Sequence, residues 1–196
     1  TRTNVLHALS HGARQVVVVT SAGPREGAST TAAGLARVLA LSGHRVVLVG
    51  GDLRSPSAVG APGAPGLAEV LVGTARLSQV LVEGEVPGLE LLPAGDMPGN
   101  PSELLGGRNM SDLLHHLAAD RIVIIDAPPV CRFTDAVVLA EYAGGVLLVA
   151  RAGRTSAEEL REAALAVGQG GGHMLGVVLT NVSDPGRGSR SVQAGV

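Results

Sequence analysis

Short, unbroken apolar runs alternate with more polar, periodic segments along the chain. The runs are rich in Val, Ile and Leu and do not alternate with polar residues, which is typical of parallel strands covered on both faces. The segments between them place apolar residues at helical spacing. This pattern predicts an α/β fold with a doubly wound, mostly parallel sheet. Strands are expected at 15–20, 45–50, 89–93, 121–126, 145–151 and 175–181, and helices at 30–42, 102–105, 111–119 and 156–167.

Two of the predicted helices carry further signals. In the first one, Leu35, Val38 and Leu39 lie on one helical face and are expected to pack against the sheet. In the last one, Ser156 is followed three residues later by Glu159, which is the spacing of a capping box at a helix start.

Two stretches are expected to be irregular. The segment 55–66 is dense in Pro and Gly and predicts a surface loop. The segment 183–196 offers almost nothing to bury and predicts a disordered tail, which leaves 1–182 as a single domain.

Composition supports one buried core and excludes several functions. With 196 residues, 45% of them apolar, the chain is long enough for one α/β domain. A net charge of −2 gives no general attraction to nucleic acid, and one Phe and one Tyr without Trp offer no platform for stacking bases. The single Cys131 excludes an internal disulfide. His115 and His116 are neighbours on a predicted helix and point in different directions, so no metal site is expected there.

The chain contains no apolar run of the roughly 18 residues that span a bilayer. It begins with Thr1 rather than Met. We therefore expect a piece of a longer protein, with any membrane anchor outside this sequence.

The stretch TSAGPREGAST, residues 20–30, joins the first predicted strand to the first predicted helix. A strand, a Gly-containing loop and a helix that opens on Ser-Thr is the layout of a phosphate-binding P-loop, in which backbone N–H groups and the helix N-terminus hold the phosphates. Ser29 is expected to offer its hydroxyl to Mg²⁺. A strand, turn and helix without a ligand is the alternative. The predicted nucleotide-binding residues are Gly23, Pro24, Arg25, Glu26, Gly27, Ala28, Ser29 and Thr30.

The P-loop motif normally ends in Gly-Lys-Ser/Thr, but Ala28 stands where the lysine belongs. That lysine reaches the β- and γ-phosphates, and one charge-assisted contact contributes about 1.5–3 kcal/mol. Its absence predicts nucleotide binding weakened roughly 10- to 100-fold. Arg25, in the same loop, is a candidate to replace part of the charge.

Two acidic residues follow predicted strands. Asp52 lies in GGDLRSP and Asp126 ends the apolar run of RIVIIDAPPV. Ligands of open α/β sheets bind at the carboxyl ends of the strands, and an Asp at such an end can hold Mg²⁺. Each Asp alone also suits an ordinary turn or strand end. Together with the loop, they predict a Mg²⁺ site made by Ser29, Asp52 and Asp126.

In the number and order of these motifs, the chain resembles the cytoplasmic domain of bacterial tyrosine kinases (BY-kinases). That family is related to the Min/Par ATPases and acts in capsule and exopolysaccharide synthesis. The resemblance covers nearly the whole chain and implies a P-loop NTPase-like fold. The matching segments are RTNV at 2–5, VTSAGPREGAST at 19–30, GGDLRSP at 50–56, GLAEVLVG at 66–73, LLPAG at 91–95, NPSELL at 100–105, IVIIDAPPV at 122–130 and Thr134-Asp135-Ala136.

The chain departs from the family pattern at catalytic positions. The resemblance implies a lysine where Ala28 stands, a glycine where Arg25 stands and an acidic residue where Gly50 stands. In the family, the two acidic residues of the segment that matches GGDLRSP serve Mg²⁺ and the activation of the attacking tyrosine; only Asp52 remains here. The tail SRSVQAGV has none of the family's tyrosines, and the one tyrosine, Tyr142, is expected to be packed.

We therefore expect a pseudokinase-like BY-kinase domain that regulates or scaffolds polysaccharide polymerisation and export, with weak or absent binding of ATP, ADP and Mg²⁺. Asp52 would be a vestigial or weak catalytic residue. One alternative is a divergent, active tyrosine kinase or ATPase in which Arg25 replaces the lysine. Another is a Min/Par-type positioning ATPase, which the NPSELL segment disfavours.

The resemblance also implies a membrane-spanning chain-length regulator as partner, fused or separate, and a place at the cytoplasmic face of the cell membrane. Family members form rings through an entry helix with an E-x-x-R-x-x-R element. Only its last Arg, Arg2, is present in this chain, so Arg2 is the predicted interface residue and the chain alone is expected to be monomeric. No nucleic-acid partner is expected.

Overall fold

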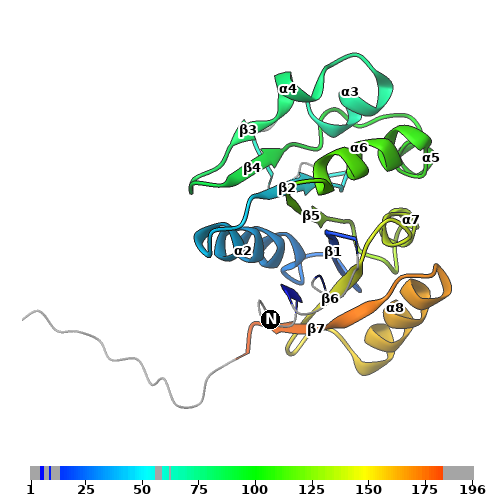
Figure 1. Cartoon of the computed structure of the whole chain (residues 1–196). Coiled ribbons are helices and arrows are strands. Elements are labelled where there is room, and N and C mark those ends of the chain that lie inside the picture. Colours follow the sequence, from blue (N-terminus) through cyan, green and yellow to red (C-terminus); the bar gives the residue numbers. More distant parts are fainter. Residues whose placement is uncertain (1–4, 7–8, 10–13, 56–58, 62, 183–196) are drawn as a thin grey trace, which may run out of the picture.

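The computed structural model describes residues 5–6, 9, 14–55, 59–61 and 63–182 of the chain (Figure 1). The predicted tail at 183–196 and the predicted interface residue Arg2 lie outside these residues. None of the helices in the described part is long and apolar enough to cross a bilayer.

Within the described residues, the strands form one seven-stranded sheet in the order β3-β4-β2-β5-β1-β6-β7. Neighbouring strands pair in parallel except β3 and β4, which are antiparallel. The predicted doubly wound sheet is confirmed, whereas β3 was missed because two residues are too few for an apolar run. The strands are β1 (Val16–Ser21), β2 (Val46–Gly50), β3 (Val82–Glu83), β4 (Leu89–Leu92), β5 (Ile122–Asp126), β6 (Gly145–Arg151) and β7 (Met174–Thr180).

Helices cover both faces of the sheet. Helix α2 packs against one face, and α3, α5, α6, α7 and α8 pack against the other. Figure 1 shows α2 on one side of the strands and α6, α7 and α8 on the opposite side. Since both faces are covered, each position of a central strand needs an apolar side chain, which explains the unbroken Val and Ile runs. The helices are α2 (Ala28–Leu41), α3 (Leu67–Val72), α4 (Leu77–Val80), α5 (Pro101–Leu105), α6 (Arg108–Ala118), α7 (Asp135–Ala140) and α8 (Ala157–Gln169).

Helix α2 corrects one prediction about the core. Leu35 and Leu39 are buried as expected, but Val38 is 42% exposed. The buried face of α2 includes Ala32 and Ala36, so its centre lies nearer these small residues, and Val38 falls outside it. The helix also begins earlier than predicted, which places Ala28 and Ser29 in its first turn.

The other helix predictions are confirmed in part. Ser156 and Glu159 form the predicted capping box: the Ser156 hydroxyl accepts from the Glu159 N–H at 3.1 Å, and the Glu159 carboxylate accepts from the Ser156 N–H at 2.8 Å. Helices α3, α4 and α7 were not predicted. Each has only four to six residues, which show no clear helical period, although the five-residue helix α5 was predicted at 102–105. The described residues of 55–66 contain no helix or strand, as expected.

The central strands β1, β2 and β5 end at one edge of the sheet. Val19 of β1 and Gly50 of β2 are both in register with Asp126, the last residue of β5. Gly51 then passes close over β5, and its N–H donates to the Asp126 carbonyl oxygen at 2.8 Å. The segments that follow these strands therefore meet at the carboxyl edge.

A substitution at Gly51 tests this close passage. A Cβ there would lie 2.6 Å from Cγ2 of Ile125, which is fully buried, and 3.0 Å from the Asp126 carbonyl oxygen. We expect Gly51→Ala to lower the free energy of unfolding by about 1–3 kcal/mol, measured in urea. The matched control is Gly34→Ala in α2, where the added methyl meets nothing within 4 Å. It should raise the free energy by ~0.5–1 kcal/mol, and equal effects of the two changes would contradict the close passage.

Candidate functional site

A cavity of about 630 Å³ opens at the carboxyl edge of the sheet. It is lined by the loop between β1 and α2, by Asp52 and Ser55 after β2, by residues after β5, and by Arg151 at the end of β6. Small-molecule sites typically have volumes of roughly 300–1,000 Å³. The predicted phosphate loop and Asp52 thus share one cavity of suitable size.

The end of the β1–α2 loop leaves the first turn of α2 open. Gly27, with φ of 99°, precedes the helix, and no side chain caps the N–H groups of this 14-residue helix. The position requires glycine, because its φ is left-handed and a Cβ would lie 3.3 Å from Cγ2 of Thr180. Uncapped N–H groups and the positive end of the helix dipole attract an anion such as phosphate.

The loop is tied to the ends of β6 and β7 by two long-range hydrogen bonds. The Thr180 hydroxyl donates to the Glu26 carbonyl oxygen at 2.6 Å, and Nη1 of Arg151 donates to the Arg25 carbonyl oxygen at 3.2 Å. The carbonyl groups of the loop are therefore held from outside by the neighbouring strands. Neither Arg151 nor Thr180 was predicted as a site residue; their one signal was a position at or next to the end of a predicted strand.

The Glu26 side chain lines the cavity but is only 4% exposed. Its Oε2 atom is buried and has no hydrogen-bond partner among the described residues. A buried acceptor without a donor is costly. The loop therefore contains a buried acceptor that no donor of the described residues satisfies.

The predicted Mg²⁺ residues come together below the loop. The Ser29 side chain and the Asp52 charge both act on the Asp126 carboxylate: Ser29 lowers its pKa and Asp52 raises it. Asp126 is 2% exposed, and burial raises its pKa to about 6. Among the described residues, no three His, Cys, Asp or Glu side chains form a metal cluster. Two carboxylates and a hydroxyl nevertheless suit Mg²⁺, which usually keeps waters and phosphate oxygens as its other ligands.

Asp52 is held by its own loop. Its Oδ1 atom accepts from the N–H of Arg54 at 3.0 Å and from the N–H of Ser55 at 3.2 Å. Burial raises the pKa of Asp52, and the two backbone hydrogen bonds oppose that rise. The carboxylate thus has a fixed direction before any ligand binds.

Ala28 and Gly50 stand at the two positions where the sequence predicts lost catalytic side chains. Ala28 is the first residue of α2 and is 9% exposed, so only a methyl group stands where the motif places an ammonium. Gly50 ends β2 beside Asp126. An acidic side chain at position 50 would add a carboxylate next to Asp126; glycine adds none.

Three guanidinium groups belong to residues that line the cavity. They are those of Arg25, Arg132 and Arg151. Arg25 is exposed and has a φ of 62°, which is uncommon for a residue with a side chain. Arg132 was also missed in the sequence, because nothing in the chain order places it near the loop. These groups supply positive charge around the cavity, although none replaces the ammonium at position 28 from the same backbone position.

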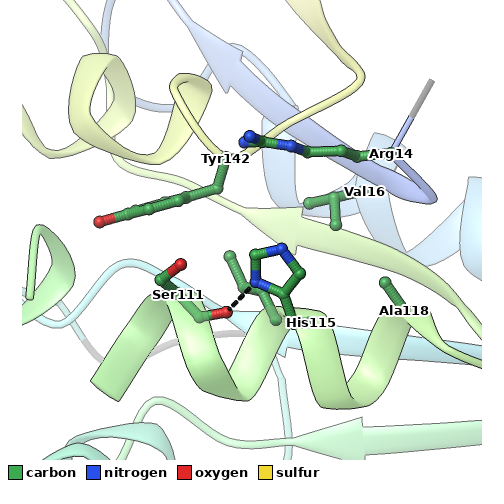
Figure 2. Close-up of a pocket in the computed structure, with 7 residues that line it drawn as sticks. Arg14, Val16, Ser111, His115, Ala118 and Tyr142 are labelled. Carbon is green, nitrogen blue, oxygen red and sulfur yellow. Dashed lines mark hydrogen bonds between the residues drawn. The ribbon is translucent and has the colours of Figure 1, made fainter. Parts of the chain in front are cut away.

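A second, much smaller cavity lies at the amino edge of the sheet, beside Val16 at the start of β1 (Figure 2). Its volume is about 30 Å³, which suits little more than one water molecule. Figure 2 shows Tyr142 and Arg14 on one side and His115 on the other, with Nδ1 of His115 2.8 Å from the Ser111 carbonyl oxygen. Tyr142 is half-buried against the core, as predicted.

The sequence comparisons give a consistent family. No family model matches the chain. It is 37% identical over 188 residues to the putative tyrosine-protein kinase EpsB of Ralstonia nicotianae, covering 94% of this chain and 25% of that protein. It is 36% identical over 182 residues to the tyrosine-protein kinase YwqD of Bacillus subtilis, covering 91% and 77%. The chain thus spans about a quarter of EpsB and most of YwqD.

Solved structures that resemble the chain include a tyrosine kinase domain, in agreement with the names of these relatives. The chimerical protein CapA2B2 has a TM-score of 0.88 at 32% identity, over 93% of this chain and 82% of that one. The kinase domain of the Escherichia coli tyrosine kinase ETK has a TM-score of 0.85 at 30% identity, over 93% and 75%. The cell division ATPase MinD of Pyrococcus furiosus has a TM-score of 0.70 over 86% and 73%, but its 21% identity supports the P-loop NTPase-like fold alone.

The buried carboxyl of Asp126 makes stability depend on pH. Since its pKa is about 6 in the folded chain and 3.8 in the unfolded reference, its contribution to stability is present below 3.8 and is lost as the pH rises through 6. We expect Asp126→Asn to raise the free energy of unfolding by about 1–3 kcal/mol at pH ~7.5, with a smaller gain at pH ~4. Thermal unfolding at both values measures this. Asp120→Asn, on the surface beside Arg45 and Arg121, is the control; an equal gain there would contradict the account.

Proposed function

The chain belongs to the bacterial tyrosine-protein kinases, and we propose that it is a catalytically impaired, pseudokinase-like domain of this family. In this proposal it regulates or scaffolds the polymerisation and export of a cell-surface polysaccharide. The observation that carries the proposal is Ala28, a methyl group in the first turn of α2 where a P-loop requires a lysine.

The loss bears directly on phosphoryl transfer. Catalysis of that reaction depends on positioning the γ-phosphate and neutralising its charge, with little covalent work by the protein. Ala28 removes one cation from the phosphates, at about 1.5–3 kcal/mol per contact. Gly50 removes one carboxylate from the edge where Asp52 and Asp126 remain. Charge neutralisation and acceptor activation are therefore both weakened.

The remaining parts support weak binding of ATP or ADP with Mg²⁺. The open N–H groups of α2 would hold a phosphate, while Ser29, Asp52 and Asp126 would hold the cation. Mg²⁺, when bound, would neutralise charge on the β- and γ-phosphate oxygens. Asp52, whose direction is fixed by its loop, would be the residue closest in role to the family's activating acid.

Partners and location follow from the family. We propose that the chain works beside a membrane-spanning chain-length regulator, fused or separate, at the cytoplasmic face of the cell membrane. EpsB, of which the chain spans a quarter, leaves room for such a fused segment in that protein. Ring assembly through Arg2 and a monomeric state of the chain alone remain predictions, because residue 2 lies outside the described residues.

The arginines around the cavity favour a second candidate, a divergent active kinase or ATPase. Arg25 lies in the loop itself, and Arg132 and Arg151 line the same cavity. A guanidinium binds phosphate well, so these side chains would supply part of the missing charge. A Min/Par-type positioning ATPase gains no such support, since the MinD and McdA structures are 20–23% identical and bear on the fold alone.

Calorimetry with ADP and ATP, with and without Mg²⁺, shows whether the loop between β1 and α2 still binds nucleotide once a lysine is restored. We expect Ala28→Lys to bind nucleotide roughly 10- to 100-fold more tightly than the parent chain, because the lysine restores one charge-assisted contact. Ala28→Met is the matched control, with similar length and no charge. Equal gains from Lys and Met, or tight Mg²⁺-dependent binding by the parent, would contradict the proposal.

The second candidate makes its own prediction at Arg25. If its guanidinium replaces the lysine, Arg25→Ala should lower nucleotide affinity about tenfold and abolish turnover. In the main proposal, the same change alters the weak affinity less than about twofold. Arg154→Ala, on the exposed turn after β6 and outside the cavity lining, is the control. A coupled assay of ATP hydrolysis and a binding titration give the two readouts.

A further inference from the structure

Arg54, two residues after Asp52, makes a two-point ion pair with a residue far away in sequence. Its Nε donates to Oδ2 of Asp135 at 2.6 Å, and its Nη2 donates to Oδ1 at 3.1 Å. The side chain of Asp135 is fully buried, and that of Arg54 is 28% exposed. This is the fork-to-carboxylate geometry that only arginine provides.

Two further side chains complete this contact. The Ser102 hydroxyl, from α5, accepts from Nη2 of Arg54 at 3.0 Å and donates to Oδ1 of Asp135. The ring of Phe133 lies against the Arg54 guanidinium, with 4.6 Å between the ring centroid and Cζ. Both oxygens of the buried carboxylate therefore have donors. Burial alone would raise the pKa of Asp135, but the hydrogen bonds from Arg54 and Ser102 outweigh burial and hold it below its usual value.

The contact fixes the loop that carries Asp52. The backbone N–H groups of Arg54 and Ser55 donate to Oδ1 of Asp52, so the carboxylate direction depends on where residues 52–55 lie. The side chain of Arg54 anchors the same short segment to α5 and α7. Asp52, Ser55 and Phe133 all line the cavity, so the anchored segment is part of its wall.

From these contacts we propose that Arg54, Ser102 and Asp135 form a positioning clamp that sets the Asp52 carboxylate relative to Ser29 and Asp126. The three members come from three segments that are far apart in the sequence, GGDLRSP, NPSELL and Thr134-Asp135-Ala136, and each segment contributes one of them. The effect of the clamp on nucleotide affinity rests on the proposed function, because it acts through the Mg²⁺ that Asp52 would help to hold. Its effect on the position of residues 52–55 is independent of the proposed function.

The first test measures amide hydrogen exchange in the loop that carries Asp52, without any ligand. Asp135→Asn keeps the size of the side chain but loses the charge that holds the guanidinium, and Arg54→Lys keeps the charge but loses the fork. In both variants the backbone amides of residues 54 and 55 should exchange hydrogen about tenfold faster, relative to the amides of Val123 and Ile124 in β5. Asp120→Asn, which disturbs a surface ion pair, should leave that ratio unchanged. An unchanged ratio in both clamp variants would overturn the proposal.

The second test measures ADP affinity, with and without Mg²⁺, in chains that carry Ala28→Lys. Adding Asp135→Asn should reduce the Mg²⁺-dependent gain in ADP affinity about tenfold and leave Mg²⁺-free affinity within about twofold, because only the Asp52 side of the site moves. Equal losses with and without Mg²⁺ would indicate a general structural role and overturn the positioning role. If Ala28→Lys itself binds no ADP, the proposed function fails, while the exchange experiment still decides the clamp.

Discussion

The convergence of parallel strand ends at one edge of the sheet is the constraint on which the rest of the structure depends. β1 leads into the phosphate loop, β2 into the Asp52 loop, and β5 ends on Asp126. The ends of β6 and β7 supply Arg151 and Thr180, which hold carbonyl groups of the loop. The sheet brings these ends together because β1, β2, β5, β6 and β7 all point the same way. The strand order therefore places the loops of the site, and these loops stay in place when one side chain is lost.

At this edge, charge decides what chemistry is possible. Two carboxylates, those of Asp52 and Asp126, lie close to where phosphates would bind, and so does Glu26, whose Oε2 atom has no partner in the described part of the chain. In a P-loop with a lysine, that cation and Mg²⁺ balance the negative charge. Here Ala28 offers nothing, and the arginines that line the cavity come from other directions. The open N–H groups of α2 therefore support phosphate binding, and in the proposed function the neutralisation of charge in the transition state is incomplete.

The sequence predicted the fold well, because strands buried on both faces must be apolar at each position and so stand out as unbroken runs. It missed β3, α3, α4 and α7, whose few residues show no period of their own. Val38 was misplaced since helical spacing alone does not tell which flank of α2 meets the sheet. In the site, the motif residues were found because each motif is a short continuous stretch at or just after the end of a predicted strand. The partners of Arg54 and Arg151 were missed because they are 81 and 126 residues away. Such contacts depend on tertiary packing.

In the proposed function, the chain keeps the frame of a bacterial tyrosine kinase while phosphoryl transfer is impaired. Mass spectrometry of phosphotyrosine, after the pure chain is incubated with Mg²⁺, ATP and a tyrosine-containing acceptor peptide, tests this directly. We expect no phosphotyrosine above that formed by Asp52→Asn. Steady phosphorylation of the acceptor or of Tyr142 that disappears in Asp52→Asn would contradict it.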